Sequence, residues 1–113
     1  MTQTPSTVVF VSLTGDEEIK VYDLDQSSGA LSLRVTNPAH GPSGALFLHP
    51  TLDVLYDAHV ESTTLASFRL NKTTGQVTLF NSVDTGIGIP AHSVTDSQGR
   101  YLLTAYYGGG GIT

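Results

Sequence analysis

The sequence predicts an all-β fold, part of a β-propeller, from an internal repeat, a strand-rich composition and the absence of helical periodicity. Three pairs of aromatic or glycine residues recur at the same separation of 46 residues: Phe10 and Tyr56, Tyr22 and Phe68, and Gly29 and Gly75. A repeat of roughly 40 to 50 residues made of short strands is typical of a propeller blade. Charged residues make up only 13% of the chain, and no long segment shows a 3.6-residue apolar period. We therefore expect about two and a half four-stranded antiparallel blades.

The first unit, residues 8–35, is predicted to be a partial blade. Alternating apolar residues place strands at Val8–Leu13, Ile19–Leu24 and Leu31–Val35. Between the last two strands, Asp25 can bond backbone two residues further on, and Gly29 can adopt positive φ, so this segment predicts a tight turn. Residues 1–7, which precede the unit, are expected to form a disordered tail.

The second unit, residues 44–82, is predicted to contain four strands. Its strands are expected at Gly44–Leu48, Val54–Ala58, Leu65–Leu70 and Val77–Asn81. The turn of the first unit recurs between the last two strands, with Asn71 in place of the aspartate and a glycine four residues later. In the third unit, residues 91–113, strands are expected at Ala91–Thr95 and Tyr101–Tyr107.

The charge and the residue types exclude several classes of function. The net charge is −5 with only five Lys and Arg, so no basic stripe is available to bind nucleic acid or an anionic membrane. The chain has no cysteine, which excludes a disulfide framework and a thiolate metal site. No signal segment or membrane span is apparent, so a cytoplasmic protein is expected.

The final third carries a resemblance to a known family. The segments that carry it are Gly88-Ile89-Pro90-Ala91-His92-Ser93, Gly99 to Ala105, and Tyr107-Gly108-Gly109-Gly110. They resemble the seven-bladed β-propeller lactonases, which include 6-phosphogluconolactonases of the propeller type and carboxymuconate cyclases. Where the family's typical pattern has an asparagine before Tyr-Gly-Gly-Gly, this chain has Tyr106. The resemblance implies a seven-bladed ring, of which this chain would be a truncated part, and a lactone-opening activity that the part alone would largely lack. In the family's phasing, residues 44–82 would be the one complete blade, residues 8–35 a partial blade, and residues 91–113 the inner half of a further blade.

Four candidate site residues follow from the chemistry of lactone hydrolysis, which needs a group to activate water and donors for the developing oxyanion. His92 is the candidate catalytic residue because it titrates near neutrality and lies where the chain enters an innermost strand; the alternative is a loop histidine that bonds nearby backbone. Tyr107, Gly108 and Gly109 could let backbone amides approach an anion, or could form a flexible hairpin loop.

Other histidines and carboxylates could also take part in binding. His40 lies in a loop that looks analogous to that of His92 and is a candidate for substrate binding, whereas His49 looks like a turn residue. Asp57, His59 and Glu61 alternate on one strand and could contact a metal or form a solvated face, and we expect no metal. No Gly-x-Ser-x-Gly motif supports a serine hydrolase, and no cofactor is expected.

We therefore expect a hydrolase that opens a sugar-acid lactone, with a small-molecule lactone as its partner. Exposed strand edges are expected to meet the remaining blades or a second copy. The alternative is a non-enzymatic propeller-repeat protein that binds partners through its blade surface, because propellers host both kinds of function.

Overall fold

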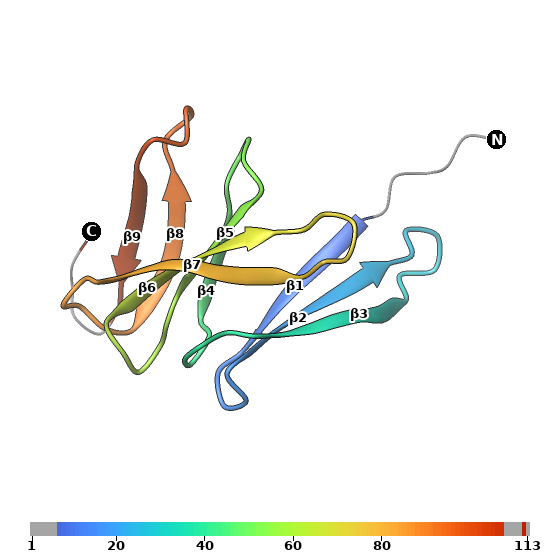
Figure 1. Ribbon diagram of the computed structural model, residues 1–113, viewed down its shortest axis with the longest axis horizontal. Helices are drawn as coiled ribbons and strands as arrows, with labels where there is room; N and C mark the ends of the chain where they lie inside the picture. The colour runs from blue at the N-terminus through green and yellow to red at the C-terminus, as the bar shows by residue number, and fades with distance from the viewer. Residues whose placement is uncertain (1–6, 108–111, 113) are drawn as a thin grey trace.

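The computed structural model describes residues 7–107 and 112, which form three antiparallel sheets that follow one another along the chain (Figure 1). The first sheet contains β1 (Thr7–Leu13), β2 (Glu18–Leu24) and β3 (Leu31–Pro38). The second contains β4 (Ala45–Leu48), β5 (Val54–Ala58), β6 (Thr64–Leu70) and β7 (Val77–Asp84). The third contains β8 (Pro90–Thr95) and β9 (Leu102–Tyr106). The described residues include no helix that could cross a membrane.

The repeat is visible in the register of the strands. Phe10 pairs with Val21 in the first sheet, and Tyr56 pairs with Ser67 at the same place in the second. Both sheets also carry a β-bulge at the same repeat position, between Val21 and Tyr22 and between Ser67 and Phe68. β1, β2 and β3 are therefore the counterparts of β5, β6 and β7.

The predicted turn has the same hydrogen bonds in both copies. In the second sheet, the Asn71 side chain accepts from the backbone N–H of Thr73 at 2.9 Å, and the N–H of Gly75 donates to the Asn71 carbonyl at 2.8 Å. In the first sheet, Asp25 accepts from the N–H of Ser27 and from that of Gly29, at 2.9 and 2.7 Å. The two glycines have φ of 77° and 80°, in the left-handed region that glycine adopts without strain.

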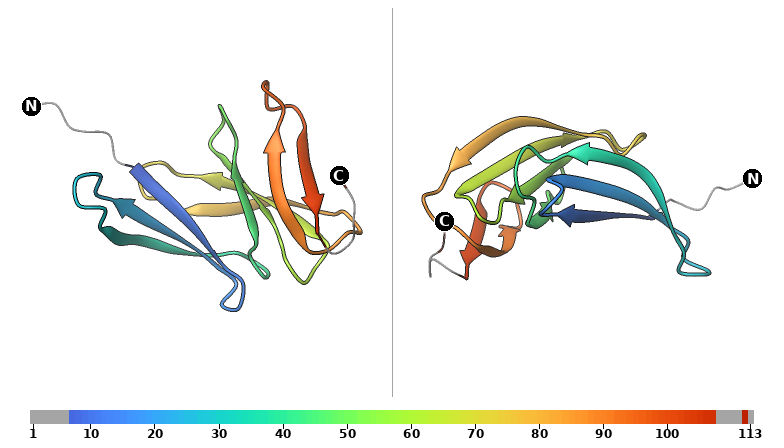
Figure 2. Two further views of the ribbon diagram at one scale, coloured as in Figure 1. Left: turned by 180° about the vertical axis from the view of Figure 1, so that it is seen from behind. Right: turned by 90° about the horizontal axis from the view of Figure 1, so that it is seen from below.

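The sheets are arranged side by side, with the main core between the first and the second (Figure 2). Ile19 and Ala39 contribute to it from the first sheet and the loop after it. Leu55, Phe68 and Val77 contribute from the second sheet, and Phe68 is fully buried. On the other side of the second sheet, β4 lies next to β8, so the first strands of the two sheets are neighbours. The prediction of an all-β partial propeller is confirmed.

Some predicted boundaries were wrong by a few residues. β3 continues to Pro38 and β7 to Asp84, because each pairs with β2 or β6 along that strand's whole length. β9 ends at Tyr106 and does not include Tyr107. Thr7, predicted to belong to the tail, is the first residue of β1, and residues 1–6 lie outside the described residues.

Candidate functional site

Two loops lead into the first strands of the second and third sheets, and both are held in the same way. In the β3–β4 loop (residues 39–44), the carbonyl of Pro42 accepts from the N–H of Val60 at 2.9 Å. In the β7–β8 loop (residues 85–89), the carbonyl of Ile89 accepts from the N–H of Tyr107 at 2.8 Å. The loops are therefore structural counterparts at the same end of the neighbouring strands β4 and β8.

His92 lies inside β8, as its third residue, and its side chain is exposed. It pairs with Ala105, as Ala45 of β4 pairs with Ala58, so Ala45 is its counterpart in the second sheet. Among the described residues the imidazole has no hydrogen-bond partner, which does not match the alternative of a loop histidine bonded to backbone. An accessible imidazole on a strand suits a group that takes a proton from water. The catalytic role of His92 stays a prediction.

His40 is not the counterpart of His92, and the expected analogy between them was wrong. It lies five residues before Ala45, in the β3–β4 loop, and has a φ of 60°, which is uncommon for a residue with a Cβ. Its side chain is exposed, with the ring stacked against Phe68 at a centroid distance of 6.3 Å. His40 is therefore held against the core while remaining open to solvent.

The predicted anion-binding segment is described only at its first residue. Tyr107 follows β9 and is 85% exposed, so its side chain does not contribute to the core. Its backbone N–H is already bonded to Ile89, so that amide is not free for an anion. Gly108 and Gly109 lie outside the described residues.

The alternation of Asp57, His59 and Glu61 predicted a metal site or a solvated face, and the structure shows neither arrangement. Asp57 and His59 are buried, at 0% and 3% exposure, whereas Glu61 is exposed in the turn beyond β5 with a φ of 58°. The described residues contain no cluster of three metal-ligating side chains. The side chains of Asp57 and His59 do share a face, but the β3–β4 loop covers that face.

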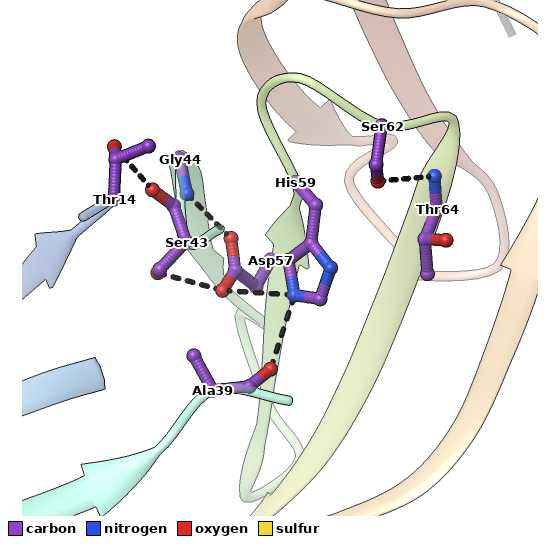
Figure 3. Close-up of polar contacts among 8 residues, drawn as sticks. All are labelled: Thr14, Ala39, Ser43, Gly44, Asp57, His59, Ser62 and Thr64. Carbon is purple, nitrogen blue, oxygen red and sulfur yellow. Dashed lines mark hydrogen bonds and ion pairs between the residues drawn. The ribbon is translucent and has the colours of Figure 1, made fainter. Parts of the chain in front are cut away.

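Asp57 is the centre of a buried polar network (Figure 3). One carboxylate oxygen accepts from the Ser43 hydroxyl at 2.7 Å, and the other accepts from the N–H of Gly44 at 2.9 Å. His59 Nε2 lies 3.5 Å from the same carboxylate and 3.1 Å from the Ala39 carbonyl. The Ser43 carbonyl in turn accepts from the Thr14 hydroxyl, which belongs to the turn after β1. The network therefore joins the first sheet to the second.

The network is not a nucleophilic triad. The Ser43 hydroxyl donates to Asp57 and not to His59, whereas a catalytic serine must be bonded to its base. Its hydrogen bond to Asp57 raises the pKa of His59 more than burial lowers it, and the nearby Asp57 and Glu17 charges and the Ala39 carbonyl raise it further. A buried imidazole with a raised pKa beside a carboxylate is suited to holding the loop.

Two further side chains join the second sheet to the third. His49 Nδ1 accepts from the N–H groups of Thr51 and Leu52, so its proton is on Nε2, which donates to the Gly99 carbonyl at 3.0 Å. Tyr106 is buried and donates its hydroxyl proton to Thr85 at 3.2 Å. Tyr106 is the counterpart of His59, so the tyrosine that departs from the family pattern holds the β7–β8 loop. His49 is a turn residue, as predicted.

A cavity of about 420 Å³ lies between the first two sheets, near Leu48 at the far end of β4 from these loops. Its apolar lining includes Phe10 and Leu70, and its two cations are already paired, Arg34 with Asp23 and Lys72 with Asp53. The described residues that line it include none of the predicted site residues.

Sequence reasoning missed the roles of Ser43, Asp57, His59 and Tyr106. The signal in the sequence was a pair of polar residues, Asp57 and His59, at the end of an apolar strand. A polar side chain that is buried at such a place requires a hydrogen-bond partner. The partners could not be identified, since Ala39 and Thr14 are brought to the site only when the sheets pack together.

Comparison with known proteins gives one curated relative and several solved structures. The chain is 32% identical over 103 residues to the 6-phosphogluconolactonase of Serratia proteamaculans, and it spans about 30% of that protein's length. A candidate 6-phosphogluconolactonase from Bacteroides fragilis superposes with a TM-score of 0.81 at 20% identity, over 96% of this chain and 31% of that one. The periplasmic gluconolactonase of Pseudomonas aeruginosa superposes with a TM-score of 0.70 at 19% identity, over 90% of this chain and 30% of that one.

These solved structures, at their low identity, support the fold. The model of the seven-bladed β-propeller lactonase family matches residues 6–113, which is nearly the whole chain. The match includes all three sheets and both of the loops that lead into β4 and β8. The chain therefore belongs to the seven-bladed β-propeller lactonase family.

Proposed function

We propose that the chain forms part of a propeller that hydrolyses a sugar-acid lactone, with the end of β4 and β8 that carries His40 and His92 contributing to the site. The observation that carries the proposal is the family match over residues 6–113. The substrate class is suggested by the Serratia relative, which is named a 6-phosphogluconolactonase. The proposed partner is therefore a small-molecule lactone.

In the proposed reaction, water attacks the carbonyl carbon of the lactone. His92 accepts a proton from this water, the new C–O bond forms, and the ring C–O bond breaks. The released alkoxide takes up the proton from His92, which gives a hydroxy acid and returns the imidazole to its neutral form. The exposed position of His92 on β8 leaves its imidazole open to water and substrate.

The chain alone is expected to hydrolyse lactones poorly. An anionic sugar-acid lactone needs cationic or amide donors, and the chain has only five Lys and Arg in all. Among these, Arg34 and Lys72 are paired with carboxylates at the opposite end of the strands from His40 and His92. We propose that other blades of a complete ring supply the remaining groups.

The test is to measure hydrolysis of 6-phosphogluconolactone by two proteins. The first is the chain itself, and the second is a chimera in which the chain replaces the matching 30% of the Serratia relative. The proposal predicts little activity from the first and clear activity from the second. A folded chimera without activity would contradict the function, and robust activity from the chain alone would contradict the shared site.

The second candidate function is partner binding through apolar surface. It is favoured by Leu31 and Leu33 of β3, which are 53% and 54% exposed on one sheet. Their counterparts in the second sheet, Val77 and Leu79, contribute to the core or pack against it. A further β-sheet, from another blade or a second copy, would cover this face. An inactive chimera that binds a separate protein through β3 would favour this alternative.

A further inference from the structure

We propose that His59 is a positioning residue for the candidate site: it fixes the β3–β4 loop, and with it His40, where the chain enters the second sheet. Its importance for catalysis rests on the proposed function. The contacts of the loop, however, can be tested without any assay of activity.

The contacts run along consecutive parts of the loop. His59 Nε2 lies 3.1 Å from the Ala39 carbonyl, and both groups are buried. Gly41 packs directly against the imidazole: a Cβ added to this glycine would lie 2.5 Å from His59 Nδ1. Val60, which follows His59 in the chain, donates its N–H to the Pro42 carbonyl at 2.9 Å. His59 and its neighbour thus hold the loop on both sides of His40 (Figure 3 shows the Ala39 contact).

His40 has a conformation that needs such support. Its φ of 60° is unfavourable for a residue with a Cβ, and its ring stacks against the buried Phe68 at an interplanar angle of 30°. Because Ala39 and Gly41 are held by His59, the loop can keep His40 in this conformation with its side chain exposed to solvent.

The charged groups around His59 make the hold dependent on pH. Asp57 of β5 faces it at 3.5 Å, and Glu17 of the β1–β2 turn adds an attraction to the imidazolium. His40 is the titratable side chain on the β3–β4 loop, which His59 contacts. His59 Nε2 faces two acceptors, so this nitrogen keeps its proton when the ring is neutral. Deprotonation of the imidazolium therefore removes only the attraction between its positive charge and the two carboxylates.

The sign follows from the raised pKa of His59, whose largest cause is the hydrogen bond to Asp57. The additional stabilisation of the loop by the imidazolium charge is complete below the ordinary histidine pKa of about 6.5. It is lost as the pH rises through the higher value that His59 has in the folded chain. The β3–β4 loop is therefore held more tightly in mildly acidic than in alkaline solution.

The next sheet provides a matched control. Tyr106 is the counterpart of His59, and its hydroxyl holds the β7–β8 loop through Thr85. Tyr106→Phe should loosen that loop and leave the β3–β4 loop unchanged. His59→Leu, which has no donor for Ala39, should do the opposite. His59→Gln retains a donor but does not titrate, so it should restore the hold and remove its pH dependence.

The experiment measures amide hydrogen exchange by NMR in the wild-type chain and these three variants. The reporters are the N–H groups of Val60 and Tyr107, which bond to the β3–β4 and β7–β8 loops. His59→Leu is expected to lower the protection of Val60 at least about tenfold and to leave Tyr107 unchanged. Tyr106→Phe is expected to show the reverse pattern. In the wild type, the protection of Val60 should fall as the pH is raised, and in His59→Gln it should not.

Unchanged protection of Val60 in His59→Leu would overturn the proposal, and so would equal pH dependence in the wild type and His59→Gln. If His59→Leu does not fold, the comparison of His59→Gln with the wild type decides the question. In the active chimera, His59→Gln should change the pH profile of lactone hydrolysis. An inactive chimera would contradict the proposed function and leave the exchange result as the test of the loop.

Discussion

At the scale of single residues, buried polar side chains join one sheet to the next. Asn37 of the first sheet donates to the Gly75 carbonyl and accepts from the N–H of Val77 in the second, at 3.2 and 3.0 Å. Asp57 receives two donors from the segment that leads into β4. Such bonds are directional, so they fix the position of neighbouring sheets more closely than apolar contact alone.

Asp57→Ala should destabilise the chain strongly, because it leaves the Ser43 hydroxyl and the Gly44 N–H buried without their acceptor. The expected loss in the free energy of unfolding is about 2 to 5 kcal/mol. Asp53→Ala is the matched control: its carboxylate pairs with Lys72 at the surface, and the loss should be about 0 to 1 kcal/mol. Urea unfolding measures both, and equal losses would contradict the role of Asp57.

Gly99→Ala should disrupt the contact between the second and third sheets. An added Cβ would lie 2.3 Å from His49 Nε2, and the φ of 69° is unfavourable for alanine. We expect a loss of about 1 to 3 kcal/mol in the free energy of unfolding. Gly15→Ala, where nothing lies within 4 Å, should change the stability by about 0.5 kcal/mol or less. Thermal melting of the two variants gives the comparison, and similar melting temperatures would show that the contact is unimportant.

At the scale of elements, the same turn occurs in two environments. Gly29 and Gly75 close equivalent hairpins with the same positive φ, but nothing lies within 4 Å of a Cβ at Gly29. A Cβ at Gly75 would lie 3.1 Å from side-chain atoms of Arg34 and Val35. The hairpin between β6 and β7 therefore also packs against the first sheet, whereas its counterpart is free of such contact.

Gly29→Ala and Gly75→Ala should differ for this reason. In both variants an alanine must adopt the positive φ, which lowers the free energy of unfolding by about 1 kcal/mol. Gly75→Ala must also displace side chains of the first sheet, so we expect a total of about 2 to 3 kcal/mol. Urea unfolding of both variants measures the difference. A larger loss for Gly29→Ala would mean that the packing of the second hairpin contributes nothing.

These turns show how far the sequence alone predicts the fold. Asn71 and Gly75 act within one hairpin, so their spacing was sufficient to predict the turn, the bond of the Asn71 side chain to the backbone of Thr73, and the positive φ of Gly75. The phasing of the resembling family likewise predicted Val54–Ala58 as a strand, and β5 has these bounds. The candidate site could not be predicted as well, because the Ala39 carbonyl is 20 residues away from the His59 that it contacts. Packing of one sheet on another decides which polar residues are buried.

At the scale of the whole molecule, the three sheets differ in how much of their surface is covered. The second sheet has a neighbour on each side, and most of the core side chains belong to it. Large apolar side chains are exposed at 45% or more in every sheet: Leu31 and Leu33 in the first, Phe80 and Val83 of the edge strand β7 in the second, and Val94 and Leu103 in the third. Uncovered apolar faces of this kind favour association with another β-sheet.

The chain of 11.9 kDa is therefore expected to self-associate. Leu31→Lys with Leu33→Lys should shift the chain toward the monomer in size-exclusion chromatography, because charge on this face opposes its burial. Lys substitutions at Thr36 and Ser32, two exposed polar residues of the same strand, serve as the control. Elution of the wild-type chain as a clean monomer would contradict the prediction.

The proposed role of this chain in opening a lactone is tested most directly by His92→Ala in the chimera with the Serratia relative. Replacement of a positioned acid–base group typically lowers the rate by about 10²- to 10⁴-fold. We expect a loss in turnover of 6-phosphogluconolactone of at least about tenfold, a threshold set below this typical range, at an unchanged melting temperature. Wild-type turnover in this variant would contradict it and would leave His92 as an exposed strand residue without a part in the reaction.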